Sequence, residues 1–393
     1  MTATTDPRAL TQSGAQALGR GDFAGARGLF EQILAGGGED GPVLLGLAVA
    51  CRGLGDGAAM LAALDRLLER EPRHLRGLLM KADHFAAAGD GRAAAGFYRA
   101  ALRAAPPPEQ LPPPVAADVR RAQAAVEAYA RDYERHLEAA LAAGGVDPAS
   151  PEAARFGQSL DLMLGRRQLF LQQPRHYYFP GLPQIQFYPR EPFGWLGELE
   201  AAAADIRAEL DGLLADGGGF APYLETRSDR PFAEGHGMRD NPDWGAIYLW
   251  RDGERVDAVA DRCPRTLEAI AGAPLCRIEG RTPSILFSRL AAGARIPPHN
   301  GFINTRLICH LPLILPGQCG FRVGNETREW REGEAWLFDD TIQHEAWNES
   351  GEDRVILIFD IWRPELTEAE REMVGALFAA VDSYGGAGQA WGV

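Results

Sequence analysis

The chain has 393 residues, 46% hydrophobic and 24% charged, which is enough for roughly two or three domains with buried cores. Its formal net charge of −14 argues against nucleic acid and anionic membrane as partners, because binding either requires a basic surface. The N-terminus lacks the basic and apolar regions of a signal peptide, and no apolar run approaches the roughly 18 residues of a membrane span. Five scattered cysteines without a CxxC pair predict reduced thiols and a cytoplasmic location.

Three helical repeats are predicted in the first 114 residues. Gly-Asp pairs at Gly21, Gly55 and Gly89 are 34 residues apart, and each separates two helix-like segments. Buried-type residues recur in phase with them, in two sets: Ala26, Met60 and Ala94, then Phe30, Leu64 and Tyr98. A helix-turn-helix period of 34 residues is typical of tetratricopeptide repeats, in which each helix pair buries its apolar face against the next.

The proline-rich segment 106–114 ends the repeats, because successive prolines cannot continue a helix. Apolar residues at helical spacing then predict a long amphipathic helix that caps the repeat stack: Val119, Ala122, Val126, Tyr129, Tyr133 and Leu137. Further helices are expected within residues 151–170 and 193–214.

Short strands separated by turns follow Trp244, which is typical of a sandwich or jelly roll. They are expected within five segments: 284–290, 305–313, 320–323, 335–338 and 354–362. The predicted fold class is therefore multidomain α and β, with helical repeats followed by a jelly roll. The predicted domains are 1–114 (repeats), 115–173 (a helical connecting region) and 174–393 (the β domain).

Two histidines separated by several short strands and followed by a strand arginine are typical of a jelly-roll iron oxygenase. In that arrangement His299 and His344 hold Fe(II), and Arg354 binds the far carboxylate of 2-oxoglutarate. Either histidine alone also fits a structural residue at a strand end, and Arg354 also fits a simple ion pair. Asp339 and Asp340 fit either an acidic catalytic pair or a turn cap before His344.

Period-two alternation gives two of the strands one polar face each. The residues on these faces are Arg306, Ile308 and His310 on the first strand, and Arg354, Ile356, Ile358 and Asp360 on the second. A guanidinium that lines a barrel requires an anion, because a buried unpaired charge is costly. A dicarboxylate supplies that anion in bidentate geometry.

Five stretches between about Trp244 and Arg371 resemble one enzyme family. They are Pro297-Pro-His-Asn-Gly, Asn304-Thr-Arg-Leu-Ile-Cys-His-Leu, Asn325-Glu-Thr-Arg-Glu-Trp-Arg-Glu-Gly, Leu337-Phe-Asp-Asp-Thr-Ile-Gln-His-Glu-Ala-Trp and Asp360-Ile-Trp-Arg-Pro-Glu-Leu-Thr. The family is the aspartyl/asparaginyl β-hydroxylases, oxygenases that use Fe(II), 2-oxoglutarate and O2. The resemblance implies a double-stranded β-helix in which His299 and His344 bind iron. It also implies 2-oxoglutarate contacts from Ser288, His310 and Arg354, and a substrate near Trp244 and Arg306.

Two further positions refine what the resemblance implies. Related oxygenases outside the family use a carboxylate as the third iron ligand, whereas this family has a glycine there, here Gly301. The third facial position is therefore expected to hold water. The chain departs from the family at Ile308, where members that modify animal proteins carry an arginine that binds the substrate carboxylate.

The predicted function is thus an Fe(II)- and 2-oxoglutarate-dependent hydroxylase of a peptide or protein side chain, of Asp or Asn type, that produces succinate and CO2. The repeats are expected to recruit the substrate. One alternative is an oxygenase that acts on a small molecule or a lipid acyl chain. Another is a non-catalytic repeat scaffold with a degenerate jelly roll, against which the complete set of candidate residues argues.

Overall fold

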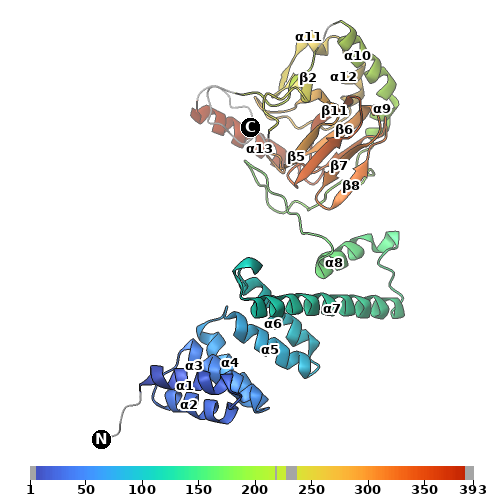
Figure 1. The fold of residues 1–393 in the computed structure, drawn as a ribbon. Helices are drawn as coiled ribbons and strands as arrows, with labels where there is room; N and C mark the ends of the chain where they lie inside the picture. Colours follow the sequence, from blue (N-terminus) through green and yellow to red (C-terminus); the bar gives the residue numbers. More distant parts are fainter. Residues whose placement is uncertain (1–5, 217–218, 227–236, 386–393) are drawn as a thin grey trace. The chain divides into compact units, whose positions relative to one another are not determined.

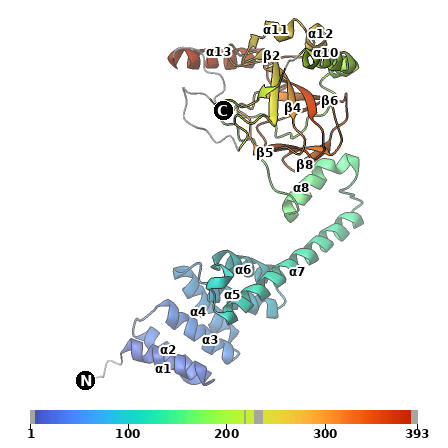
Figure 2. The ribbon, with the colours of Figure 1, turned by 45° about the horizontal axis from the view of Figure 1, so that its top comes forward.

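The computed structural model describes residues 6–216, 219–226 and 237–385, and the chain divides into two compact units between Leu164 and Gly165 (Figure 1). Helices make up the N-terminal unit: α1 (Pro7–Gly19), α2 (Phe23–Ala35), α3 (Gly41–Gly53), α4 (Gly57–Arg70), α5 (Leu75–Ala87), α6 (Gly91–Ala104), α7 (Pro113–Ala143) and α8 (Ala154–Leu164). The helices from α1 to α6 pack as successive pairs (Figure 2). The predicted helical repeats are therefore confirmed.

The Gly-Asp pairs lie at the turn between the two helices of each repeat. Gly21, Gly55 and Gly89 have φ values of +76°, +74° and +78°, a region that glycine enters without a steric penalty. The aspartate after each glycine caps the following helix, because its carboxylate accepts a hydrogen bond from the backbone N–H three residues later. One dipeptide thus ends one helix and begins the next.

Helix α7 covers the last repeat over only part of its length. Ala122 is fully buried and, with Ala125 and Val126, packs in the same cluster as residues of α5 and α6. Tyr133 is 41% exposed on the same helix. The predicted apolar face is therefore buried only in its first half. Length explains this, because α7 has 31 residues and α6 has 14.

The C-terminal unit contains two antiparallel sheets. In the larger sheet the order is β1-β2-β4-β11-β6-β9 with β3 beside β2, and in the smaller sheet it is β5-β10-β7-β8. The strands are β1 (Ala221–Pro222), β2 (Trp244–Arg251), β3 (Glu254–Arg255), β4 (Ile285–Leu290), β5 (Arg295–His299), β6 (Arg306–Ile314), β7 (Cys319–Val323), β8 (Glu326–Glu329), β9 (Trp336–Phe338), β10 (His344–Asn348) and β11 (Arg354–Trp362). This arrangement confirms the predicted jelly-roll class.

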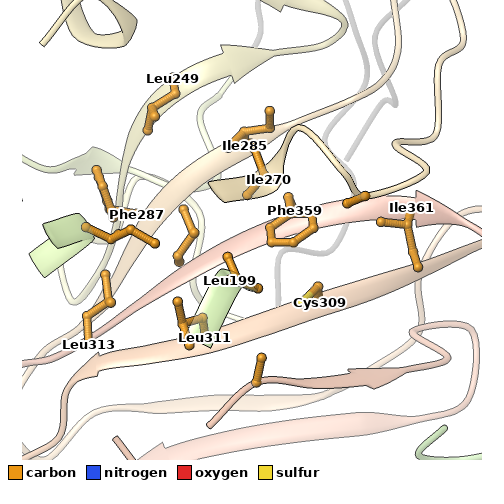
Figure 3. Packing of buried hydrophobic residues seen from close by; sticks show 14 of the residues in the cluster. Leu199, Leu249, Ile270, Ile285, Phe287, Cys309, Leu311, Leu313, Phe359 and Ile361 are labelled. Carbon is orange, nitrogen blue, oxygen red and sulfur yellow. The ribbon is translucent and has the colours of Figure 1, made fainter. Parts of the chain in front are cut away.

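Helices cover one face of the larger sheet. The helices of this unit are α9 (Leu196–Ala201), α10 (Ala203–Ala215), α11 (Asp257–Ala260), α12 (Pro264–Ile270) and α13 (Glu368–Gly385). Cys309 and Leu311 of β6 pack in one core cluster with Leu199 of α9 and Ile270 of α12 (Figure 3). Leu307 of β6 and residues of α10 belong to the same cluster. The alternate residues of β6 face the other way and line a cavity. The predicted division of this strand into two faces is confirmed.

Two predictions from the sequence concern the state of the cysteines and the absence of membrane-spanning segments. All five cysteines are buried and carry no disulfide bond. In the part of the chain that the structure describes, no helix combines the length and apolar character that crossing a bilayer requires.

We expect residues 165–393 to fold when expressed without the N-terminal unit, because their apolar clusters include no residue from before Gly165. A single cooperative thermal transition with β-rich circular dichroism is the expected result. A fragment that is unfolded while the full chain is folded would contradict this independence.

Candidate active site

A cavity of about 140 Å³ lies where the two sheets face each other. Its lining includes all the residues predicted to bind iron, 2-oxoglutarate or substrate: Trp244, Ser288, His299, Arg306, His310, His344 and Arg354. A neighbouring cavity of about 350 Å³ shares part of its lining, namely Tyr223, Leu224, Phe302, Arg306, Ile308 and Ile358. The site therefore has a small inner chamber beside a larger one.

Strand pairing holds the two histidines together. His299 ends β5, His344 begins β10, and the two residues are opposite each other in the antiparallel register. Their ring centroids are 4.1 Å apart. The Nδ1 of His299 is 2.8 Å from the carbonyl of Pro297, and the Nδ1 of His344 is 3.1 Å from the carbonyl of Ile342.

These two contacts set the tautomers of the histidines. A carbonyl can only accept a hydrogen bond, so each Nδ1 donates and each lone pair is on Nε2, the nitrogen suited to a metal. Burial also lowers the pKa of His344 to about 4, which keeps this ring neutral near pH 7. In the described ranges no group of three or more His, Cys, Asp or Glu side chains could hold a metal ion. Two protein ligands are thus the most that these side chains offer.

Arg354 is a buried cation without an acidic partner among the described residues. The residue is 1% exposed, and no carboxylate of the described residues pairs with its guanidinium group. Its guanidinium carbon lies 5.3 Å from the centre of the Trp330 ring, a cation–π contact that offsets part of the cost of burying the charge. Burial lowers the pKa of Arg354 to about 10. The simple ion pair considered from the sequence is therefore absent among these residues.

Two polar side chains accompany Arg354 in the inner chamber. The Ser288 Oγ accepts a hydrogen bond of 3.3 Å from the indole Nε1 of Trp244, which leaves the serine O–H proton to donate elsewhere. His310 is 6% exposed, and its Nδ1 has no hydrogen-bond partner within the described ranges. Burial, followed by the charge of Arg354, holds the pKa of His310 well below its usual value. Both groups suit contact with an anionic ligand, the serine as a donor and His310 as a neutral ring.

Arg306 lies between two buried carboxylates. Its Nη2 is 3.1 Å from Asp340 Oδ2, and its Nη1 is 3.4 Å from Asp360 Oδ2. Burial disfavours its charge, but the two carboxylates outweigh burial and raise the pKa of Arg306. Asp340 also fills the space beside Gly301, because a Cβ at position 301 would overlap its carboxylate. The cavity thus already contains a carboxylate next to Gly301, supplied from residue 340.

The two adjacent aspartates have different roles. Asp339 Oδ1 accepts hydrogen bonds from the backbone N–H and hydroxyl of Thr341, as a turn cap does, and Oδ2 pairs with Arg363 at 2.7 Å. Asp340 instead faces the cavity. The turn-cap interpretation is therefore correct for Asp339 and wrong for Asp340.

Sequence reasoning missed two aromatic residues of the site. Tyr223 stacks on Trp244 with ring centroids 4.1 Å apart, and Trp330 stacks against His310 at 5.5 Å. Trp330 lies in one of the motif stretches, which was a usable signal. Tyr223 follows the two-residue strand β1, which has no recognisable pattern in the sequence.

The C-terminal unit is similar to known hydroxylases. Residues 200–364 match the family model described as aspartyl/asparaginyl beta-hydroxylase. The mouse (Mus musculus) protein named aspartyl/asparaginyl beta-hydroxylase is 35% identical over 148 residues, which are 37% of this chain and 19% of that protein. Aspartate beta-hydroxylase domain-containing protein 2 of Xenopus tropicalis is 30% identical over 215 residues, 53% of this chain and 55% of that protein. The predicted resemblance to this family is therefore confirmed.

A third relative has a different kind of name. The ornithine lipid ester-linked acyl 2-hydroxylase of Rhizobium tropici is 31% identical over 180 residues, which are 45% of this chain and 60% of that protein. The chain spans less than two thirds of the length of each of these three relatives.

Because Asp340 fits closely against Gly301, one methyl group added at position 301 should have a large effect on the stability of the fold. Gly301→Ala should force the carboxylate away from Arg306 and destabilise the fold by about 1–3 kcal/mol. Chemical denaturation measures the change. Gly212→Ala in α10 is the matched control, since nothing lies within 4 Å of its Cβ position, and it should be neutral or slightly stabilising. Equal stability of the two variants would contradict the fit.

The buried charge of Arg354 predicts a gain in stability when it is removed. The pKa is lowered in the folded state, so the penalty is constant below pH 10 and fades only as the folded arginine releases its proton. Arg354→Met should therefore raise the free energy of unfolding of the ligand-free protein at pH 7.5 by about 1–3 kcal/mol. Urea denaturation checks this, and a destabilised variant would mean that Arg354 has a compensating partner.

Proposed function

From the likeness of the C-terminal unit to aspartyl/asparaginyl beta-hydroxylases, we propose that the chain is an Fe(II)- and 2-oxoglutarate-dependent hydroxylase. The observation that carries the proposal is Arg354, a buried guanidinium that lines the cavity without a carboxylate partner among the described residues. Such a group lowers the stability of the fold until an anion joins it. The distal carboxylate of 2-oxoglutarate is that anion, and it takes a hydrogen bond from the Ser288 hydroxyl.

The histidine pair supports the metal part of the proposal. His299 and His344 would hold the ion through Nε2, since their Nδ1 atoms donate to backbone carbonyls. Neutral imidazoles suit Fe(II), and the neutrality of His344 near pH 7 means that no proton has to leave it. With two protein ligands, the remaining positions fall to 2-oxoglutarate and small molecules.

When bound, Fe(II) and 2-oxoglutarate use O2 to place one oxygen atom in a substrate C–H bond and the other in succinate, with release of CO2. The protein binds, orients and shields the reactants. Arg354 and Ser288 anchor the cosubstrate, and the apolar walls that include Phe321 and Phe338 keep bulk water away from the reacting carbon. The larger neighbouring cavity gives room for the rest of the substrate.

The proposed substrate is a side chain of a peptide or protein, of Asp or Asn type, as the names of two relatives suggest. The helical repeats would recruit it, because stacked helix pairs build extended surfaces that bind peptides. The proposed location is the cytoplasm, in keeping with five buried cysteines that form no disulfide bond.

A lipid acyl chain is the second candidate substrate. The Rhizobium tropici relative is named for acyl 2-hydroxylation, and the lining beside the histidines includes a set of apolar residues: Ile296, Ile308, Ile356 and Ile358. An acyl chain would use these residues but would leave the polar atoms of Arg306 and Asp340 without a role in binding it.

Anaerobic titration tests the proposed function directly. Fe(II) added with 2-oxoglutarate should give a weak visible charge-transfer band in the wild-type chain, and His344→Ala should lose it. His84→Ala, which removes an imidazole from the N-terminal unit, is the matched control and should keep the band. A wild-type protein with intact circular dichroism and no band would contradict the proposal.

Cosubstrate binding gives a second measurement. Mn(II) takes the place of Fe(II) here, so that no turnover occurs. 2-Oxoglutarate and Mn(II) should then raise the melting temperature of the wild-type chain. They should leave the melting temperature of Arg354→Met unchanged, because the variant loses about 2–5 kcal/mol of binding free energy for 2-oxoglutarate. Equal ligand-induced stabilisation of both proteins would mean that Arg354 does not bind 2-oxoglutarate.

A further inference from the structure

The wall of the cavity formed by Arg306 is acidic rather than basic. One guanidinium faces the carboxylates of Asp340 and Asp360, so the three groups together carry one net negative charge when all are ionised. All three side chains are at most 9% exposed, which limits screening by water. Arg306 is thus already neutralised by the protein and does not present a net positive charge to a substrate.

The next inward position on the same strand face is apolar. Ile308 follows Arg306 at the period-two spacing of β6 and lines both cavities. Of the remaining arginines in the described lining of the inner chamber, Arg354 is the proposed partner of the cosubstrate and Arg175 is exposed. A substrate carboxylate seated beside Ile308 would therefore meet a net negative wall and an aliphatic side chain.

Asp340 also offers an unused hydrogen-bond acceptor. Its Oδ2 pairs with Arg306, whereas Oδ1 is buried and has no hydrogen-bond partner among the residues that the structure describes. A buried carboxylate oxygen without a donor is unfavourable, so a ligand that brings an N–H or O–H group to it is favoured over one that brings another anion.

We propose that the side chain presented for hydroxylation is a carboxamide, of asparagine type, rather than the carboxylate of an aspartate. This inference rests on the proposed peptide hydroxylase function and selects between its two named side chains. The amide N–H group donates to Asp340 Oδ1, and the absence of charge avoids repulsion from the pair of aspartates. The discrimination should be at least about tenfold in kcat/KM, since an isostere without the donor leaves a buried acceptor unpaired.

Two randomised heptapeptide libraries, alike except for a central Asn or Asp, test the proposal without knowledge of the flanking sequence. The full chain with Fe(II), 2-oxoglutarate and O2 should add one oxygen to the Asn library at least about ten times faster, as mass spectrometry measures. On immobilised protein with Mn(II), 2-oxoglutarate and no O2, the Asn library should also be retained more strongly. This second arm reads binding without turnover.

Variants at Ile308 supply the matched comparison. Ile308→Arg should shift the preference toward the Asp library by at least about tenfold, whereas Ile308→Met, of similar bulk and no charge, should keep the Asn preference. The wild-type measurement alone decides the case if the arginine variant does not fold. Arg175→Gln tests one source of any Asp preference, because this exposed arginine also lines the inner chamber.

The outcomes separate this inference from the proposed function. Equal or faster oxidation of the Asp library by the wild-type chain overturns the inference and leaves peptide hydroxylation standing. Succinate production without oxygen in either library overturns peptide hydroxylation, and the inference with it, in favour of an acyl or small-molecule substrate.

Discussion

The pairing of β6 with β11 in the larger sheet is the constraint on which the C-terminal unit depends. The register sets Ile358 opposite His310 and Asp360 opposite Ile308, so polar residues from both strands come to one face. The intervening residues, such as Leu357 and Cys309, are fully buried in the core beneath the helices. A shift of one residue in this register would exchange the two faces and bury the charges in the core. The same pairing therefore secures the packing and the site.

The inner face carries charges that the fold itself does not balance. Arg306 has two carboxylates and Arg354 has none among the described residues, so the excess negative and positive charges lie at different places on one wall. A protein stabilised only by packing would not retain such groups, because uncompensated buried charge is unfavourable. The imbalance is consistent with a wall shaped for ligands that bring the missing charge and the missing hydrogen bonds.

Much of this arrangement could be predicted from the sequence because it follows from periodicity. The spacing of Gly21, Gly55 and Gly89 fixes the repeats, and alternation along β6 and β11 assigns Arg306 and Arg354 to the inner face. The position of Asp340 could not be predicted. It depends on how the turn after β9 places one of two adjacent aspartates beside Gly301, a tertiary contact without a periodic signal. Tyr223 could not be predicted as a site residue for the same reason, because its role comes from stacking on Trp244 across the edge of the sheet.

The carboxylate beside Gly301 also constrains how this site could change over evolutionary time. A conventional three-ligand iron site would need an acidic side chain at position 301, but residue 340 already fills that volume. A lineage moving toward such a site would have to change both position 301 and position 340. A new acidic side chain at position 301 alone would crowd the pocket, and loss of the Asp340 side chain alone would leave it empty. If His299 and His344 hold iron as proposed, a conversion of this site to three protein ligands would therefore take at least two substitutions, although it adds only one ligand.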